Sequence, residues 1–270
     1  MSAEVQVFDQ SRIQNNITWL AENPYPGRGI VLGNSADNSR AVQAYWVMGR
    51  SDNSRNRVLA PHLDVVRTEA FDESKMTDPS LVIYNAMVED TIAPPTDNDP
   101  STRLFIVSNG DQTDSVRTRI SNSSYGDSGY DDSFRNALLG REFEPDAPNF
   151  TPRITGMLAL RSEVALGRYY YSIIRRNPTT AQPEHAFGQG DLQDIPGGTG
   201  ICFHTYDWDG DPVPEFDGSP YAIPLETTTD GIAGSLWDSL DSDNRVALAV
   251  KTIDKRTGEI DLKIVNQLAA

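Results

Sequence analysis

The segments of this chain that favour β-strands come in adjacent pairs, and this order restricts the fold more than any other feature. Residues 29–33 and 41–49 form one pair around a polar turn, and residues 246–253 and 259–265 form another. Strands that follow one another closely pair antiparallel, whereas a doubly wound parallel sheet needs a helix between successive strands. We therefore predict an α+β protein in which two mostly antiparallel sheets pack face to face, with helices outside.

The other elements are expected from hydrophobic spacing and from the residues that end each run. The pattern predicts about eight or nine strands and three or four helices in all. Further strands are expected at residues 81–87, 104–107, 154–160, 168–175 and 201–206. Helices are expected at residues 12–22, with Ser11 as the N-cap, and at residues 133–141 and 231–240. Loops are expected at residues 89–102 and 178–199, and a loop or frayed helix at residues 115–132.

Size and composition fit one domain. The chain has 270 residues, of which 38% are hydrophobic, and this is enough for one substantial core. No apolar run approaches the roughly 20 residues that cross a bilayer, and the acidic start, with Glu4 and Asp9, does not resemble a secretory signal. The single cysteine, Cys202, lies in an apolar run and is expected to be a buried thiol. We therefore expect a cytoplasmic protein with no membrane partner.

The net charge of −16 is unevenly distributed. Residues 1–70 hold seven basic and seven acidic side chains, so the whole negative excess lies beyond them. Nucleic acid is not an expected partner, because the chain offers no basic face to displace its counterions. All but four of the 23 basic residues are arginine, which suits bidentate pairing with a small anion.

Three arginines follow the strand expected at residues 41–49, namely Arg50, Arg55 and Arg57. Guanidinium groups held at a strand end can bind a phosphate through parallel hydrogen bonds. Arg28 precedes the first strand of the same predicted hairpin, so we expect Arg28 and Arg50 to be neighbours that face one cleft. The alternative is a solvated turn, which is the usual place for a run of charges.

A polar turn follows the strand expected at residues 104–107. Its Asn109, Gly110 and Asp111 form either a simple turn or a set of donors and acceptors beside a strand end, where sites often lie. The sequence has no Gly-rich phosphate loop, no G-x-S-x-G elbow and no Cys or His pair with zinc spacing. The acidic run at residues 207–211 lacks the glutamate that ends a calcium loop, so no metal is expected.

Two glutamates, Glu142 and Glu144, flank one phenylalanine. In an extended segment both carboxylates would point the same way, repel each other and raise the pKa of one of them. A glutamate with a raised pKa suits general acid or base catalysis. The alternative is an exposed acidic linker between a helix and a strand.

Four motifs occur in order along residues 25–154. They are Tyr25-Pro26-Gly27-Arg28-Gly29, Ala44-Tyr45-Trp46-Val47-Met48-Gly49-Arg50-Ser51 with Asn56-Arg57, Ser108-Asn109-Gly110-Asp111-Gln112-Thr113-Asp114 and Asn149-Phe150-Thr151-Pro152-Arg153-Ile154. With these motifs the chain resembles the archaeal-type IMP cyclohydrolase family, in a form that looks like a bacterial branch. The likeness is looser after residue 154, where His204-Thr205-Tyr206 is the best remaining match. One domain, residues 1–270, is expected, with the motif-bearing core at about residues 20–210.

The resemblance implies a fold and a reaction. The fold is a four-layer αββα sandwich of the N-terminal nucleophile hydrolase type, and Ser2 is not expected to act as the nucleophile because a helix separates it from the first strand. The reaction is ring closure of 5-formamidoimidazole-4-carboxamide ribonucleotide to IMP with loss of water, in de novo purine synthesis. No cofactor and no metal is implied. A related ribonucleotide amidohydrolase and a non-catalytic protein that binds purine nucleotides stay open as alternatives.

The resemblance also implies roles for individual residues. Glu142 or Glu144 would be the base, and Tyr84 would donate a hydrogen bond to the carboxamide or formyl oxygen. The arginines would bind the phosphate and stabilise charge, while Asn109 and Asp111 would hold the ribose or the base. The expected set is catalytic Glu142, Glu144, Tyr84 and Arg50 with substrate-binding Arg28, Ser51, Arg57, Asn109, Gly110, Asp111 and Arg153. Whether the protein forms a homo-oligomer is left open.

Overall fold

The computed structural model describes most of the chain. The described residues are 8–76, 79, 82–92, 101–122, 127–161 and 166–268. Ser2, considered above as a nucleophile, lies outside them. Within the described residues, the helices are all too short or too polar to cross a membrane.

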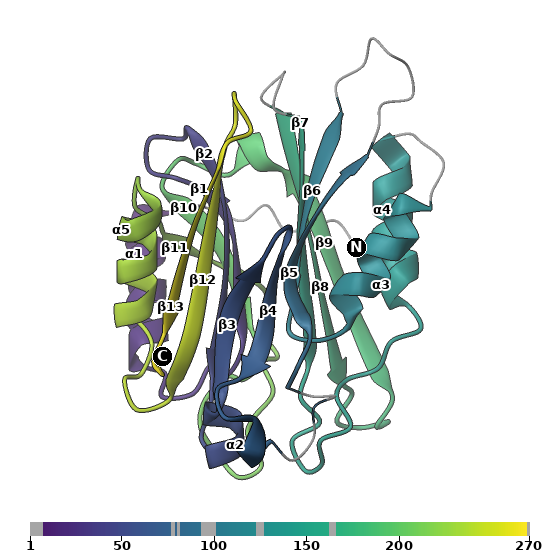
Figure 1. The fold of residues 1–270 in the computed structure, drawn as a ribbon, viewed down its shortest axis with the longest axis vertical. Helices are drawn as coiled ribbons and strands as arrows, with labels where there is room; N and C mark the ends of the chain where they lie inside the picture. The colour runs from purple at the N-terminus through teal and green to yellow at the C-terminus, as the bar shows by residue number, and fades with distance from the viewer. Residues whose placement is uncertain are drawn as a thin grey trace.

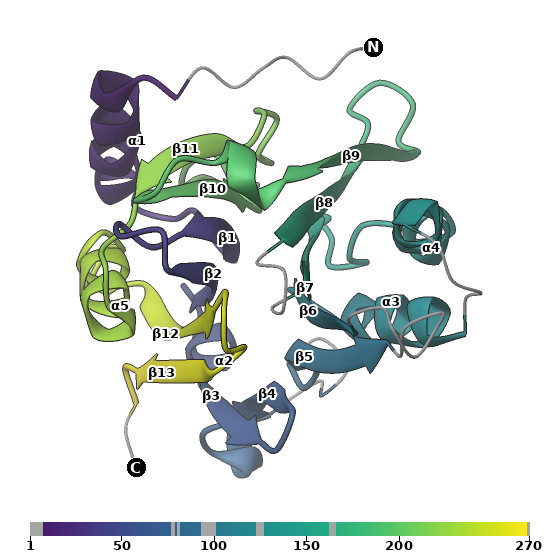
Figure 2. The ribbon, with the colours of Figure 1, turned by 90° about the horizontal axis from the view of Figure 1, so that it is seen from above.

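Two antiparallel sheets stack face to face, and two helices lie against the outer face of each sheet (Figure 1). Helices α1 (Gln10–Glu22) and α5 (Thr229–Asp238) lie outside the first sheet, and α3 (Gln112–Ser121) and α4 (Asp127–Leu138) lie outside the second. Seen from above, the two helix pairs lie on opposite sides of the molecule (Figure 2). The predicted α+β class, with two antiparallel sheets and outer helices, is confirmed.

The first sheet has six strands in the order β11-β10-β1-β2-β12-β13, and each neighbouring pair is antiparallel. Its strands are β1 (Gly29–Asn34), β2 (Arg40–Met48), β10 (Thr199–His204), β11 (Tyr221–Pro224), β12 (Arg245–Asp254) and β13 (Ile260–Asn266). The hairpins predicted from the sequence are both here, as β1 with β2 and as β12 with β13.

The second sheet has seven strands in sequence order, β3-β4-β5-β6-β7-β8-β9, again antiparallel throughout. Its strands are β3 (Arg57–His62), β4 (Val65–Ala70), β5 (Asn85–Ile92), β6 (Thr102–Ser108), β7 (Arg153–Arg161), β8 (Leu166–Arg176) and β9 (Pro183–Asp191). The two sheets are tied at one edge, where the side chain of Asn266 exchanges hydrogen bonds of 2.9 and 3.0 Å with the backbone of Leu59.

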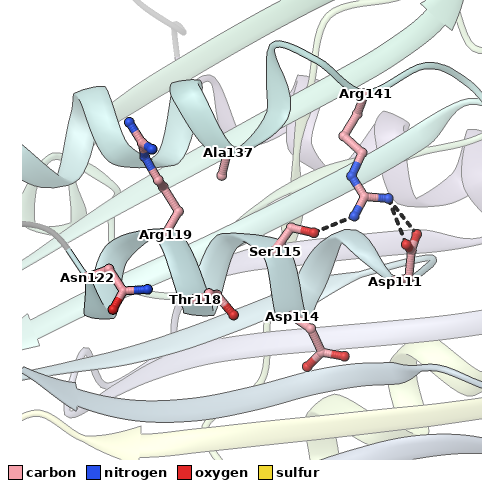
Figure 3. A pocket seen from close by; sticks show the side chains of 8 residues that line it. All are labelled: Asp111, Asp114, Ser115, Thr118, Arg119, Asn122, Ala137 and Arg141. Atoms are coloured by element: carbon pink, nitrogen blue, oxygen red, sulfur yellow. Dashed lines mark hydrogen bonds and ion pairs between the residues drawn. The ribbon is translucent and has the colours of Figure 1, made fainter.

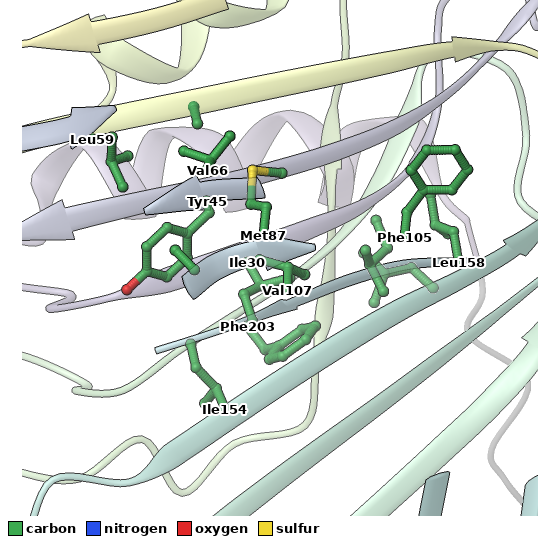
Figure 4. Packing of buried hydrophobic residues seen from close by; sticks show 14 of the residues in the cluster. Ile30, Tyr45, Leu59, Val66, Met87, Phe105, Val107, Ile154, Leu158 and Phe203 are labelled. Atoms are coloured by element: carbon green, nitrogen blue, oxygen red, sulfur yellow. The ribbon is translucent and has the colours of Figure 1, made fainter. Parts of the chain in front are cut away.

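Large apolar side chains from both sheets fill the space between them (Figure 4). Ile30 and Tyr45 come from the first sheet, Phe105 and Leu158 come from the second, and all four are fully buried. Successive residues of a strand point to opposite faces, so Trp46, next to Tyr45, packs under the outer helices instead. Because both of its faces are covered, β2 is apolar along most of its length rather than alternating.

Helix α1 starts two residues before the expected position. Asp9 is its N-cap, and the carboxylate of Asp9 accepts a hydrogen bond of 3.0 Å from the backbone N–H of Arg12. Ser11, the expected cap, lies inside the helix and donates its hydroxyl to the same carboxylate. A carboxylate at this position satisfies a free N–H group and complements the helix dipole, so it replaces the serine. The buried residues are the expected ones, Ile13, Ile17 and Leu20.

Several elements differ from the prediction. In the segment expected to be a loop or frayed helix, α3 covers residues 115–121 and α4 covers residues 127–132, and β9 lies within the loop expected at residues 178–199. The strand expected at residues 81–87 is shifted to β5, which extends to Ile92 within the loop expected at residues 89–102. A 3₁₀ turn lies at Glu73–Lys75. Strands β3, β4 and β11 were not predicted at all.

Strand β9 has the composition of a loop because of its glycines. Gly188 and Gly190 lie opposite Tyr171 and Tyr169 on β8. A side chain on Gly188 would lie 2.2 Å from the Tyr171 ring, and one on Gly190 would lie 2.8 Å from the Tyr169 ring. The glycines therefore make room for the aromatic rings of the neighbouring strand, which a residue-by-residue propensity cannot show.

Candidate active site

Strand ends from both sheets meet at the end of the sandwich that carries the short helix α2 (Asp52–Arg55) (Figure 1). The pairing of β1 with β2 puts Gly29 opposite Trp46, so the start of β1 lies beside the end of β2. In the second sheet, Ser108 lies opposite Thr155, so the end of β6 lies beside the start of β7. The residues that precede or follow these ends supply most of the polar groups expected from the sequence.

Arg28 and Glu144 form a buried ion pair at this end. Nη2 of Arg28 lies 2.8 Å from Oε2 of Glu144, and the two side chains are 11% and 6% exposed. The backbone N–H of Arg28 donates to Oγ1 of Thr205 at 3.1 Å. The preceding Gly27 has a φ of 74°, and a side chain on it would collide with Thr205 and Tyr206. Arg28 is thus fixed against the first sheet by its backbone while its guanidinium reaches the segment that leads into β7.

Burial and pairing oppose each other in this ion pair. Burial raises the pKa of Glu144 because it removes water from the carboxylate, and Arg28 offsets only part of this rise. Burial alone would lower the pKa of Arg28, but Glu144 and the surrounding tyrosines outweigh it and hold that pKa well above its usual value. Arg28 therefore stays charged, and Glu144 is a carboxyl group with increased affinity for a proton. Such a group suits acid and base catalysis.

Asn109 connects Glu144 to the second sheet. Its Nδ2 donates to the carbonyl oxygen of Pro152 at 2.8 Å and lies 3.4 Å from Oε1 of Glu144. Its Oδ1 accepts hydrogen bonds from Nε2 of Gln112 at 2.9 Å and from the backbone N–H of Ile154 at 2.8 Å. Because both ends of this buried amide have partners, its orientation beside Glu144 is fixed.

The network continues outward through Arg153. Nη1 of Arg153 donates to Oε1 of Gln112 at 2.9 Å and to Oδ1 of Asp111 at 3.2 Å. A side chain on Gly110 would lie 2.5 Å from the same Nη1 atom. Asp111 also accepts hydrogen bonds of 2.7 and 2.8 Å from Arg141. Partial burial acts to raise the pKa of Asp111, but the two arginines together hold it below its usual range. Asp111 is therefore an ionised surface carboxylate, two residues along the chain from buried Asn109.

Tyr84 and Tyr45 join the two sheets at the site. Their hydroxyl oxygens are 2.6 Å apart, and the side chains are 6% and 0% exposed. Tyr84 lies just before β5, and Tyr45 is in the middle of β2. Burial raises the pKa of Tyr45 well above its usual value, so that hydroxyl keeps its proton. In such a pair one hydroxyl donates to the other, and the second proton remains available for another acceptor.

Arg57 is a buried arginine that has no ion-pair partner among the described residues. It opens β3, is 6% exposed, and its Nε atom has no hydrogen-bond partner. It forms no ion pair with any residue that the structure describes, and its charge acts on the hydroxyls of Tyr25 and Tyr45. A buried charge without a partner is costly, and an anionic ligand would remove that cost.

Arg50 and Ser51 lie at the rim. Arg50 forms an ion pair with Asp209, donates to the carbonyl oxygen of Gly210 at 2.8 Å, and places its guanidinium carbon 4.8 Å from the centre of the Tyr25 ring. Ser51 is the N-cap of α2 and is exposed. The expected neighbourhood of Arg28 and Arg50 follows from the β1–β2 pairing, but their guanidinium groups have different partners.

The two glutamates lie in different environments. Glu142 is exposed, and its backbone oxygen accepts a hydrogen bond of 3.0 Å from Nε of Arg153, whereas Glu144 is 5% exposed. The expectation that both carboxylates point the same way is therefore wrong. One pKa is raised, as predicted, but the cause is burial of Glu144, with a further contribution from Asp146, and not the neighbouring Glu142.

A groove with a volume of about 680 Å³ runs between α3 and α4, outside the second sheet (Figure 3). Polar side chains of α3 line it, and Arg141 reaches into it to contact Asp111 and Ser115 (Figure 3). Asp111 is the one expected site residue in its lining, so the groove adjoins the Arg28–Glu144 site without containing it.

A family model described as IMP cyclohydrolase-like protein matches residues 25–258. The chain belongs to this family. No protein with a curated description matches it. The match includes every site residue expected from the sequence and extends well beyond residue 154, where the motifs alone became less clear.

This IMP cyclohydrolase-like protein has site residues that the sequence reasoning did not single out. Tyr45 is paired with Tyr84, and Gln112 holds Asn109. The hydroxyl of Tyr206 contacts Oγ1 of Thr151, and burial raises the pKa of Tyr206 above its usual value. Tyr45, Gln112, Thr151 and Tyr206 all lie inside the motif segments quoted above. The motifs therefore indicated the region of the site but not these individual residues.

Other reactive side chains of the IMP cyclohydrolase-like chain have structural partners. Among the described residues, no group of three His, Cys, Asp or Glu side chains is arranged to hold a metal ion. Burial lowers the pKa of His204 to about 3, and its ring nitrogens contact the backbone oxygen of Tyr206 and the hydroxyl of Tyr221, each at 2.9 Å. Cys202 is buried as expected, and burial raises its pKa to about 12.

Proposed function

We propose that this protein is an IMP cyclohydrolase, which closes the ring of 5-formamidoimidazole-4-carboxamide ribonucleotide and releases water. The observation that supports this most strongly is the buried carboxyl of Glu144, paired with Arg28 and adjoining the amide of Asn109, in a member of the IMP cyclohydrolase-like family. A buried carboxyl with a raised pKa, held by an arginine, is the group that a dehydrating ring closure needs.

Glu144 acts on the nitrogen of the substrate carboxamide. An amide nitrogen is a poor nucleophile, so its proton must be removed as it attacks the formyl carbon. The new C–N bond forms, Glu144 takes one proton from the carboxamide nitrogen, and this proton passes to the formyl oxygen, which becomes a C–OH. When the C–O bond breaks, the neighbouring formamide nitrogen loses its proton and a C=N bond forms. The same carboxyl carries that second proton to the hydroxyl, which leaves as water. The raised pKa of Glu144 supports both halves of this exchange.

Arg28 and the tyrosine pair stabilise the oxygen that leaves. Arg28 stays charged and is held at 2.8 Å from Glu144, so it supplies positive charge beside the reacting groups. The Tyr45–Tyr84 hydroxyl pair has one proton free to donate to the former formyl oxygen or to the carboxamide oxygen. Both groups are buried, where a hydrogen bond to a developing charge is worth more than in water.

The phosphate binds to arginines at the rim. Arg57 is buried without an anionic partner among the described residues, and Arg50, on the other side of helix α2 in the chain, is exposed. Asn109, Asp111 and Arg153 lie on the side of β6 and β7 and contact the ribose or the base. Glu142 lies outside the buried site, so we assign the proton transfer to Glu144 alone. We also propose a cytoplasmic location and a likeness to the N-terminal nucleophile hydrolase fold.

The test is the reaction itself. The purified protein is incubated with the formylated ribonucleotide, and IMP is followed by its absorbance and by chromatography. The proposal requires IMP to form in the wild type and in Glu142→Gln, and to form far more slowly in Glu144→Gln. A protein that binds IMP but forms none would be a non-catalytic nucleotide-binding protein. One that releases formate or ammonia instead would be an amidohydrolase.

A further inference from the structure

The rim arginine of the site is already held by a carboxylate of the same chain. Arg50 pairs with Asp209 and also donates to the carbonyl oxygen of Gly210 at 2.8 Å. Asp209 lies in an exposed turn between β10 and β11, 159 residues from Arg50 along the chain. A carboxylate approaches a guanidinium along the same edge that a phosphate would use.

This contact lies beside the buried site and not on a remote surface. The Arg50 guanidinium lies 4.8 Å from the Tyr25 ring, and Tyr25 stacks on Tyr206 with ring centres 5.6 Å apart. The charges of Arg28, Arg50 and Arg57 all act on the Tyr25 hydroxyl. Arg50 is therefore part of the same positively charged surroundings as the two buried arginines.

We propose that Asp209 competes with the phosphate of the substrate for Arg50 and so sets how tightly phosphorylated ligands bind. The idea rests on the proposed function, because it takes Arg50 as a phosphate contact. A phosphate dianion carries more charge than a carboxylate and displaces it from the arginine. A nucleoside without a phosphate gains nothing from Arg50 and leaves the Asp209 contact in place.

The exposure of the pair makes this exchange easy. The Arg50 and Asp209 side chains are 34% and 43% exposed, and ion pairs in such positions are weak because water screens them. Substrate and product carry the same phosphate, so the competition weakens both equally. Weaker binding of the product favours its release, which limits turnover in many enzymes.

The turn that carries Asp209 is anchored at its base, and its tip is held by the Arg50 contact. Asp207 donates its backbone N–H to Pro214 at 3.0 Å, and Val213 donates to Oδ1 of Asn149 at 3.1 Å. Between these anchors, Trp208 is 44% exposed. When phosphate replaces Asp209, the tip moves away from Arg50 and the surroundings of Trp208 change. The fluorescence of Trp208 therefore reports the exchange.

The experiment compares two variants in the same turn. Asp209→Asn removes the competing charge, and Asp211→Asn removes one charge from an exposed side chain that forms no ion pair within the described part of the chain. IMP and inosine are titrated against each variant and the wild type, with calorimetry and Trp208 fluorescence as readouts. Asp209→Asn is expected to bind IMP about two- to fivefold tighter, as loss of a weak surface ion pair implies. Inosine binding should stay unchanged, and Asp211→Asn should match the wild type.

Three further comparisons decide between the outcomes. Placing Asp209→Asn in an Arg50→Ala background should abolish the gain in IMP affinity, and Trp208→Phe should abolish the fluorescence change. Equal IMP affinity in both Asn variants, or weaker binding in Asp209→Asn, overturns the competition. If the wild type does not bind IMP, the proposed function fails, and inorganic phosphate becomes the probe. Tighter phosphate binding in Asp209→Asn alone then supports the competition, and equal binding overturns it.

Discussion

Replacing Glu144 by glutamine is the most informative single change in the proposed mechanism. Glutamine keeps the shape of the side chain and one oxygen that can accept from Arg28, but it cannot take a proton. General base catalysis contributes roughly 10²–10⁴-fold, so we expect kcat to fall by about that factor. KM should change little, because the contacts that we assign to the phosphate and ribose lie on other residues.

The same substitution should also lower stability, because it leaves the Arg28 guanidinium buried without its counter-charge. Removing one partner of a buried ion pair typically costs about 3–5 kcal/mol, and the hydrogen bond to the glutamine oxygen should keep the loss near the lower end. Glu142→Gln is the matched control. Glu142 is exposed, and surface changes of this kind are usually within about 0.5 kcal/mol.

Steady-state kinetics and urea unfolding of both variants separate the two effects, with kcat measured only where the protein is folded. Activity of the wild type should fall as pH drops through the raised pKa of Glu144, because a base must be deprotonated to act. The residual activity of Glu144→Gln should lack this acid limb. The reasoning is refuted if Glu144→Gln keeps near wild-type kcat, or if Glu142→Gln loses as much.

Three other predictions concern the phosphate, the pH dependence of stability and metal. Arg57→Ala should raise KM by about ten- to a hundredfold with little change in kcat, because Arg57 contacts the phosphate equally in the substrate and in the transition state. It should not lower the stability of the free protein, because it removes a buried charge that has no ion-pair partner among the described residues. An unchanged KM would place the phosphate elsewhere. His204 has a folded pKa of about 3, below its unfolded value, so its contribution to stability is complete above pH ~6.5 and declines by about 1.4 kcal/mol per pH unit toward pH ~3. Urea unfolding across this range should show a shallower decline for His204→Gln, and equal slopes would contradict the assignment. Dialysis against a chelator should leave turnover unchanged, and activity restored by a divalent ion would overturn this expectation.

The fold could be predicted where sequence spacing determines pairing. The turn between β1 and β2 is short, so the hairpin and the neighbourhood of residues 28 and 50 follow from local sequence. Helix α3 could not be recognised, because it buries only two apolar side chains, Val116 and Ile120, beside buried Gln112 and Thr113. The burial of this helix results from the sheet that it covers, so it could not be inferred from the spacing of apolar residues within the helix.

The sequence names candidate residues for this site, but it does not give their arrangement in space. The motifs mark Arg28 and Asn109 as candidates, and the spacing of the two glutamates marks Glu144. Their contacts nevertheless join residues 35 and 116 positions apart in the chain. Spacing alone suggested equal positions for Glu142 and Glu144, whereas the turn into β7 buries only the second. The Asp209 contact of Arg50 has no local signal at all, because it depends on how the turn after β10 packs against the rim.

The most direct test of the central claim is the conversion of the formylated ribonucleotide by the purified protein. We predict that IMP appears at a rate proportional to protein concentration, and that this rate falls by about 10²–10⁴-fold in folded Glu144→Gln but not in Glu142→Gln. If the wild-type protein binds the nucleotide and releases no IMP, the assignment of Glu144 as the proton-transfer group of a cyclohydrolase is contradicted.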